Sequence, residues 1–283
     1  MWSIRKSISW ATGSSRISRL RRALTLVLLL TACVSPVRAW WKYVDDLGFR
    51  TSIVVGAPFR HVVLEKPGRP ARVLHVYLDG DGTPWHASRP AADPTPRRPL
   101  VLELMRLDDH PGLYLGRPCY HGLAGDPDCA PTLWTDARYS ERVIASMAAA
   151  LARHLKSEKQ NGLVFIGYSG GGSLAMLLAP RFPQTVAVVT VAANLDIDAW
   201  TSHHRYLPLT GSLNPASQPP LPRPVYQRHY VGGRDSVVPP EIVARGSTHD
   251  DEVVVVPDFD HVCCWPRLWP SIIEGLARAI EPS

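Results

Sequence analysis

A sharp serine turn between an apolar strand and an apolar helix is the feature that most constrains the fold. The segment Gly167–Gly171 (GYSGG) follows the apolar run Leu163–Ile166 and precedes the apolar segment Ser173–Ala179. Glycines on both sides of Ser169 predict strained backbone angles that a Cβ would forbid. Such a turn lifts the serine hydroxyl clear of a sheet, beside the start of a helix. The pattern predicts a strand–turn–helix unit that presents a nucleophile; the plainer alternative is a glycine-rich packing turn.

An acid and a base follow along the chain, each just past a predicted strand. Asp235 comes after the strand 225–231 and a Gly-Gly-Arg turn, and His261 comes after the β-branched strand 252–256, expected to be buried. The carboxyl ends of parallel strands meet at one edge of a sheet, so these side chains should converge. The order Ser, Asp, His therefore predicts a catalytic triad of Ser169, Asp235 and His261.

Both the acid and the base have rivals. An Asp in a turn often only caps nearby N–H groups, and Asp196 and Asp198 follow another strand, 186–191, which makes them the alternative acids. The chain contains 11 histidines, but only His261 sits just past the last strand before a terminal helix. We therefore expect His261 to be the base and Asp235 its partner.

The strand expected at 73–78 ends in Asp79-Gly80-Asp81-Gly82. Where a nucleophilic serine stands on such a strand–turn–helix unit, one oxyanion-hole N–H comes from the residue after the serine and another from a loop after an early strand. Here these donors would be the backbone N–H groups of Gly170 and Asp81, without a role for the Asp81 side chain. A calcium loop is the competing interpretation, but no Glu stands at the twelfth position that an EF-hand needs.

Together these segments resemble the α/β-hydrolase superfamily of serine esterases, lipases, thioesterases and peptidases. The resemblance extends from Trp40 to the C-terminus, and the stretch 191–200 is similar to that of bacterial, often lipoprotein, hydrolases. Asp79 stands where lipases carry a His. The resemblance implies an α/β fold with a mostly parallel central sheet, helices on both faces and a small irregular cap segment. It implies the superfamily mechanism and does not imply a substrate.

The expected activity is hydrolysis of an ester, thioester or related acyl bond through an acyl-enzyme, with a small-molecule or lipidic acyl substrate and no cofactor or metal. An acyltransferase would use the same triad and differ only in the acceptor. A non-catalytic lipoprotein that uses this fold to bind an envelope component is the alternative from another class.

The first 33 residues resemble an export signal. Four arginines between residues 16 and 22 precede the apolar run 23–30, which is too short for the roughly 20 apolar residues of a membrane span. The ending Leu30–Cys33 resembles a bacterial lipobox, so we expect lipidation of Cys33; an ordinary cleaved signal is the alternative. Val34 follows Cys33, and we expect delivery to the outer membrane, on its periplasmic side. Residues 34–39 would form a short tether.

The positive net charge belongs to this leader. Six of the 31 basic residues lie in residues 1–33, which contain no Asp or Glu, so 25 basic and 25 acidic residues remain from Val34 onward. A neutral chain carries no basic footprint for nucleic acid, and nucleic-acid binding is not expected.

Four cysteines remain beyond Cys33, an even number that suits an exported protein. Cys119 and Cys129 flank a turn-rich stretch, and a disulfide between them would contribute on the order of 2–3 kcal/mol by the loop-entropy model. For Cys263 and Cys264 a vicinal disulfide, free thiols and pairing with the other two cysteines all stay open. A zinc site including His261 lacks the paired spacing of structural sites.

The rest of residues 34–283 suits one α/β domain. The expected elements are short strands within 40–64, a surface loop at 86–99, a strand at Leu100–Met105, a helix at Thr135–His154, and a last helix at Pro270–Ile280. The proline-rich segment 198–224 lies between two strands and is expected to be an irregular, cap-like insertion.

Overall fold

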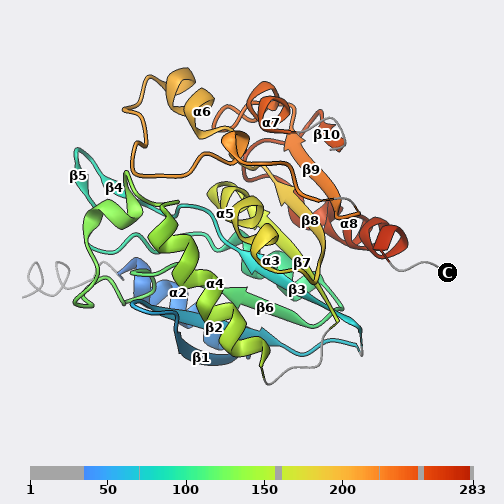
Figure 1. The fold of residues 1–283 in the computed structure, drawn as a ribbon, viewed down its shortest axis with the longest axis horizontal. Helices are drawn as coiled ribbons and strands as arrows, with labels where there is room; N and C mark the ends of the chain where they lie inside the picture. Colours follow the sequence, from blue (N-terminus) through green and yellow to red (C-terminus); the bar gives the residue numbers. More distant parts are fainter. Residues whose placement is uncertain (1–34, 70, 157–160, 223, 248–251, 281–283) are drawn as a thin grey trace, which may run out of the picture. The chain divides into compact units, whose positions relative to one another are not determined.

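The computed structural model describes residues 35–69, 71–156, 161–222, 224–247 and 252–280. Its central sheet has eight strands in the order β1-β2-β6-β3-β7-β8-β9-β10 (Figure 1). The pairs from β6 through β10 are parallel, whereas β2 runs antiparallel to both of its neighbours. The strands are β1 (Arg50–Val55), β2 (Arg60–Lys66), β3 (Val73–Leu78), β6 (Gly112–Leu115), β7 (Gly162–Tyr168), β8 (Thr185–Val191), β9 (Tyr226–Gly232) and β10 (Glu252–Val256).

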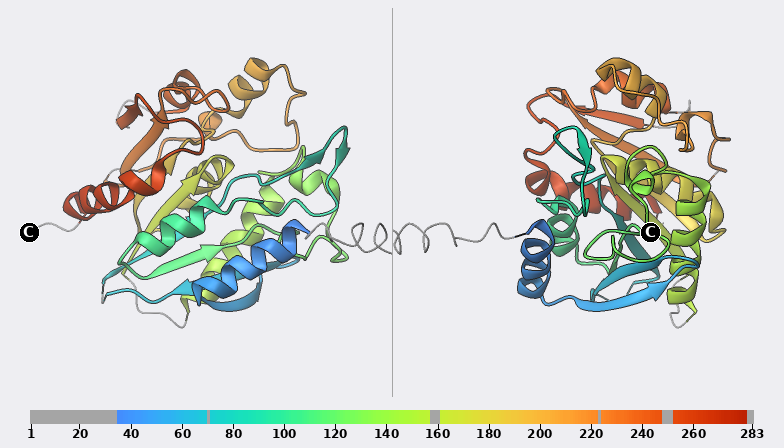
Figure 2. Two further views of the ribbon diagram at one scale, coloured as in Figure 1. Left: turned by 180° about the vertical axis from the view of Figure 1, so that it is seen from behind. Right: turned by 90° about the vertical axis from the view of Figure 1, so that its left-hand side faces the viewer.

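Helices cover both faces of the sheet because the central strands are apolar on both sides. Leu74, Val76 and Leu78 of β3 pack in the core cluster that includes α4 (Glu141–Leu155) and α5 (Gly170–Leu178). Val73 and Tyr77 pack in the opposite cluster with α2 (Pro36–Leu47), α3 (Leu100–Leu107) and α8 (Trp265–Ile280). Figures 1 and 2 show these two layers from the front and from behind.

The expected strand at Leu100–Met105 is wrong, since this segment is helix α3. Its apolar run buries Leu100, Val101, Leu102, Leu104 and Met105. The run is apolar except for Glu103. A short, mostly apolar run fits a buried strand and a buried helix equally well, so periodicity does not separate them. The helix packs against α8 and β3, which decides between the two.

The N-terminal part of the expected strand region is also different. Helix α2 occupies Pro36–Leu47 and buries Trp40 and Val44. The short strands expected within 40–64 are confirmed only after it, by β1 at Arg50–Val55 and the first part of β2 at Arg60–Lys66. The expected tether at 34–39 is therefore interrupted, since α2 begins at Pro36. The signal segment and Cys33 lie outside the described residues. Within the described part of the chain, no helix combines the length and apolarity that crossing a bilayer requires.

Two helix boundaries and the burial of one strand also differ from the expectation. The helix expected from Thr135 begins only at Glu141, because Ser140 caps it by accepting a hydrogen bond from the Val143 N–H. The last helix begins at Trp265 and carries Pro270 inside it. Strand β10 lies at the sheet edge, and its Val255 is 48% exposed, so the expectation of a buried strand fails there.

The segment expected to be cap-like contains a short helix, α6 (Ile197–His204), and a 3₁₀ helix, η3 (Pro215–Ser217). Asp196 caps α6 by accepting a hydrogen bond from the Ala199 N–H at 3.1 Å. Asn214 fixes the segment by donating to the carboxylates of Asp196 and Asp198. The segment is therefore more regular than its proline content predicts. A small two-stranded hairpin, β4 (Trp85–His86) and β5 (Arg89–Pro90), lies within the loop expected at 86–99.

Candidate active site

Ser169, His261 and Asp235 form a continuous chain of hydrogen bonds. The Ser169 Oγ lies 3.1 Å from His261 Nε2, and His261 Nδ1 lies 2.8 Å from Asp235 Oδ2. The Asp235 side chain is fully buried, whereas 14% of the His261 side chain is exposed. Because a carboxylate only accepts, Nδ1 carries the proton and Nε2 is free to accept the proton of the serine hydroxyl.

The serine turn places strain on Ser169 itself. Ser169 has φ 53° and ψ −125°, a conformation that side chains rarely adopt, and it stands at the N-terminus of α5. Neither Gly167 nor Gly170 has a positive φ, so the expectation that these glycines take the strained angles is wrong. Their role is close packing: a Cβ on Gly167 would overlap the backbone of Gly171. Strain of this kind typically marks functional sites.

The loops after β9 and β10 contact each other closely, and these contacts bring Asp235 to His261. The Arg234 N–H donates to Phe259 O at 2.9 Å, and the Gly233 N–H donates to Val256 O at 2.8 Å. A Cβ on Gly232 would overlap Phe259 O. The Gly-Gly pair before Arg234 is therefore needed for the approach of the loop that carries His261.

Backbone amides hold the Asp235 carboxylate in place. Its Oδ1 accepts hydrogen bonds from the Val237 and Val238 N–H groups, both at 2.8 Å, which leaves Oδ2 for His261. The rival acids lie elsewhere. Asp196 and Asp198 have their oxygens directed at Asn214 in the α6 region, and neither contacts His261 among the described residues.

The loop after His261 is fixed by three contacts. The Asp260 carboxylate accepts hydrogen bonds from the Val262 and Cys263 N–H groups, and the Trp265 indole donates to His261 O at 3.2 Å. A disulfide joins Cys263 to Cys264, one of the three alternatives left open by the sequence. With both sulfurs bonded to each other and His261 hydrogen-bonded to Ser169 and Asp235, these residues do not favour zinc. A second disulfide joins Cys119 to Cys129, as expected.

The segment that follows β3 lies against Ser169. A Cβ on Gly80 would lie 3.3 Å from the Ser169 Cβ, and one on Gly170 would overlap a carboxylate oxygen of Asp81. Gly170 begins α5, so its N–H has no partner within the helix. The N–H of Asp81 likewise has no hydrogen-bond partner among the described residues. Both amides therefore lack a hydrogen-bond partner among the described residues.

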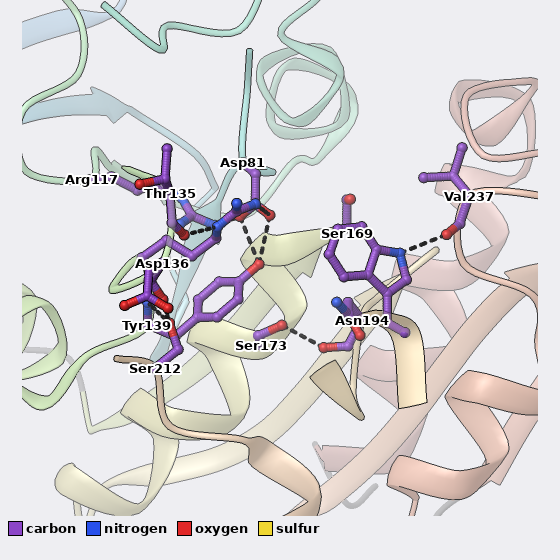
Figure 3. Close-up of polar contacts among 12 residues, drawn as sticks. Asp81, Arg117, Thr135, Asp136, Tyr139, Ser169, Ser173, Asn194, Ser212 and Val237 are labelled. Atoms are coloured by element: carbon purple, nitrogen blue, oxygen red, sulfur yellow. Dashed lines mark hydrogen bonds and ion pairs between the residues drawn. The ribbon is translucent and has the colours of Figure 1, made fainter. Parts of the chain in front are cut away.

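The surroundings of the Asp81 side chain were not predicted from the sequence. Its carboxylate pairs with Arg117 Nη2 at 2.7 Å and with Arg138 Nη1 at 2.8 Å, and the Tyr139 hydroxyl lies 2.7 Å from both oxygens (Figure 3). Burial would raise the pKa of Asp81, but Arg138 and Arg117 together with the Tyr139 hydroxyl lower it. A carboxylate engaged by two guanidinium groups does not favour the calcium interpretation.

Asp79 is buried beside this network without a full set of partners. Its Oδ1 accepts the Gly80 N–H at 2.8 Å, whereas its Oδ2 is buried with no hydrogen-bond partner among the described residues. Burial raises the pKa of Asp79 to about 7 from its ordinary 3.8, although the Gly80 N–H and Arg117 act in the opposite direction. Asp79 therefore holds a proton over most of the acidic range.

Replacing Asp79 by Asn is expected to change how stability depends on pH. Between about pH 4 and pH 7 folded Asp79 keeps the proton that the unfolded chain has lost, so wild-type stability falls as the pH rises through this window. Asn cannot ionise, so the Asp79→Asn variant should gain relative to wild type, by up to about 4 kcal/mol above pH 7. Urea unfolding at several pH values from 4.5 to 8.5 measures the difference. Parallel profiles for the two proteins would contradict the burial of an uncharged carboxyl here.

A second group of potential ligands lies away from the triad. His75, Asp108 and His110 are buried with one possible ligand atom each within 4.8 Å of the others. Arg69 donates to His110 Nε2 at 3.0 Å, so His110 Nδ1 carries a proton and donates to Asp108. His75 Nδ1 and the Tyr77 hydroxyl also lie within 2.6 Å of Asp108 Oδ2. These contacts explain the group as a buried hydrogen-bond network around one carboxylate.

Comparison with known proteins identifies solved structures with the same fold and low sequence identity to this chain. No family model and no curated protein matches the chain. An esterase from Pyrococcus furiosus superposes with a TM-score of 0.57 at 16% identity, covering 83% of this chain and 92% of that one. A bacterial membrane phospholipase A gives a TM-score of 0.53 at 15% identity, covering 93% and 98%. The mouse α/β-hydrolase domain-containing protein 10 gives 0.52 at 13% identity, covering 82% and 98%.

At these identities the likeness is one of fold. The chain has the α/β-hydrolase fold, and the expected mostly parallel sheet with helices on both faces is confirmed. The similar structures named above include hydrolases that act on esters and phospholipids. A likeness of fold does not identify the substrate of this chain.

Proposed function

We propose that this protein is a serine hydrolase that cleaves an ester or related acyl bond through an acyl-enzyme. The observation that carries the proposal is the unbroken chain from the Ser169 Oγ through both nitrogens of His261 to the buried Asp235 carboxylate. Side chains that only stabilised the fold would not require a serine in a strained conformation at a helix N-terminus, as Ser169 is. The two unpartnered amides beside Ser169 supply what an oxyanion needs.

In the proposed reaction Ser169 Oγ attacks the acyl carbon as its proton passes to His261 Nε2, and the carbonyl π bond opens to an oxyanion. The N–H groups of Gly170 and Asp81 hold this oxyanion; each such donor is typically worth about 3–4 kcal/mol. The proton on His261 then leaves with the alcohol as the tetrahedral carbon collapses to the acyl-enzyme. Water, activated by His261, attacks the acyl-enzyme and releases the acid.

Apolar side chains flank the proposed triad on the solvent side. Val237 follows the acid and Val262 follows the base, and each is 42% exposed. The aromatic side chain of Trp200 adjoins Val237, donating its indole N–H to Val237 O at 2.8 Å. Surfaces of this kind suit an acyl chain better than a charged group, because each buried CH₂ contributes up to about 0.8 kcal/mol. The proposed substrates are therefore apolar acyl esters.

A panel of p-nitrophenyl esters from acetate to decanoate tests the proposal. We expect kcat/KM to rise with acyl length, by up to about fourfold per CH₂ before it levels off. Val237→Ser and Val262→Ser should flatten this rise, whereas Val255→Ser, which changes a valine of similar exposure on edge strand β10, should leave it unchanged. No hydrolysis of any ester would contradict the function. Acyl transfer to an added alcohol in place of release as free acid would identify an acyltransferase.

The proposed location is the bacterial cell envelope. Lipidation of Cys33 would add a diacylglyceryl group and an N-acyl chain, three chains in all, which exceeds the two signals that stable anchoring takes. We expect Cys33→Ser to move the protein from the outer-membrane fraction to the soluble fraction with kcat/KM unchanged. Fractionation with N-terminal mass analysis measures this. A soluble wild type whose mature N-terminus is not Cys33 would support an ordinary secreted enzyme.

A further inference from the structure

The carboxylate of Asp81 is held by three donors from segments far away in the sequence. Arg117 follows β6, and Arg138 and Tyr139 precede α4, so 36 to 58 residues separate them from Asp81. We call Arg117, Arg138 and Tyr139 the Asp81 clamp. The two arginine side chains are 4% and 6% exposed, and Tyr139 is fully buried. Water therefore competes little for these contacts, and charge-assisted hydrogen bonds of this kind are strong and directional.

The donors of the clamp are themselves held in place. Arg138 Nε donates to Thr135 O at 2.6 Å, so its guanidinium spans a fixed backbone oxygen and the Asp81 carboxylate. The Arg117 guanidinium lies over the Tyr139 ring, 5.3 Å from its centroid. The clamp therefore has a defined geometry before any substrate binds.

The backbone of the same segment is also tied down. Arg117 Nε donates to Asp79 O at 3.4 Å, and the Tyr120 hydroxyl donates to Asp81 O at 3.0 Å. A Cβ on Gly170 would overlap both the Asp81 carboxylate and the Tyr139 hydroxyl. The clamp thus meets the nucleophile turn directly, at the residue that follows Ser169.

Stability alone does not account for the clamp. Removing two guanidinium groups and a carboxylate from water is costly, and well-packed apolar side chains commonly stabilise a core at least as well. What the charged arrangement adds is a fixed position for Asp81, whose N–H has no hydrogen-bond partner among the described residues. An oxyanion-hole donor must be held to within a fraction of an ångström, since its contribution depends on preorganisation.

We propose that Arg117, Arg138 and Tyr139 are positioning residues that act through the Asp81 carboxylate to hold the Asp81 N–H as an oxyanion-hole donor. This role rests on the proposed hydrolase function. It assigns the Asp81 side chain a part in the site as well as its backbone. It also accounts for the absence of a side chain at Gly170, where the clamp and the nucleophile turn meet.

Tyr139→Phe is the sharpest test, because it removes one hydroxyl and keeps the ring. Its matched control is Tyr77→Phe, since Tyr77 is equally buried and donates its hydroxyl to a different carboxylate, Asp108. We expect Tyr139→Phe to lower kcat about tenfold with KM nearly unchanged, less than the 10²–10³-fold loss that follows removal of an oxyanion donor itself. Tyr77→Phe should stay within twofold of wild type in kcat, even where thermal unfolding shows lower stability.

A transition-state readout separates positioning from general damage. A trifluoromethyl ketone forms a reversible bond to Ser169 Oγ; its carbonyl becomes an oxyanion as the serine proton passes to His261. We expect the inhibition constant of this ketone to rise by the same factor as kcat/KM falls in Tyr139→Phe and in a second variant, Arg138→Lys. The corresponding secondary alcohol, which cannot form the oxyanion, should bind each variant as it binds wild type.

Three outcomes would overturn the proposal in different ways. If the wild type hydrolyses esters but both folded clamp variants keep kcat and ketone affinity within twofold, the clamp has no positioning role. If the clamp variants lose affinity for the alcohol and the ketone equally, their effect is on the general shape of the site. A wild type that neither hydrolyses esters nor binds the ketone would remove the proposed function and this role together.

Discussion

Ser169→Ala is expected to lower kcat for ester hydrolysis by about 10⁴–10⁶-fold while leaving the protein folded. The triad acts as a unit, and loss of the nucleophile leaves only the modest catalysis supplied by binding and the oxyanion hole. The Ser169 hydroxyl contributes one solvent-facing contact, to His261, so the free energy of unfolding should change by less than about 0.5 kcal/mol. Initial rates and urea unfolding of the purified variant measure both quantities.

Ser173→Ala supplies the matched control, one turn further along α5. Ser173 donates its buried hydroxyl to Asn194 O (Figure 3), so its loss should lower stability by roughly 0.5–1.5 kcal/mol and leave kcat nearly unchanged. The two serines are thus expected to show opposite effects on rate and stability. Near wild-type hydrolysis by Ser169→Ala would show that the nucleophile is a different residue.

Asp235→Asn is expected to lower kcat by about 10⁴-fold. The Val237 and Val238 N–H groups require an oxygen acceptor, so the Asn oxygen should take the Oδ1 position and its NH₂ should face His261 Nδ1. The imidazole would then hold its proton on Nε2, where it can no longer accept the serine proton. Because the side chain keeps its size, KM and overall fold should change far less than kcat.

Asp198→Asn is the control for that variant, since Asp198 is the rival acid at the end of the preceding strand. Its carboxylate accepts a hydrogen bond from Asn214 and does not contact His261, so the variant should stay within about twofold of wild type. If Asp198→Asn were the more damaging change, the acid of the triad would have to be reassigned.

The sequence was sufficient for those parts of the site that depend on local signals. The GYSGG turn has a short-range chemical signature, and Asp235 and His261 could be placed because each follows a strand in a sheet whose strand ends share one edge. The type of secondary structure was predicted wrongly where the hydrophobic pattern fitted both a strand and a helix. Leu100–Leu107 is short and mostly apolar, with Glu103 and Arg106 as its charged residues, and its packing against α8 and β3 was needed to identify it as a helix.

The Asp81 clamp could not have been found by the same reasoning. Arg138 and Tyr139 precede a helix whose start was expected at Thr135, and nothing in that stretch indicates a partner 57 residues away. Arg117 did carry a signal, because it follows the short strand β6, which ends at the same edge of the sheet as β3. That strand was not anticipated, and its arginine was missed with it.

The central claim is that Ser169 is an activated nucleophile, and covalent labelling tests it most directly. A fluorophosphonate probe forms a bond from phosphorus to the nucleophilic oxygen with loss of fluoride. We expect the wild type to be labelled at Ser169, as located by peptide mass analysis. Labelling should be lost in Ser169→Ala, strongly slowed in Asp235→Asn and unchanged in Ser173→Ala. A folded wild type that stays unlabelled, or that is labelled at another residue, would contradict the account and favour a binding protein built on a hydrolase fold.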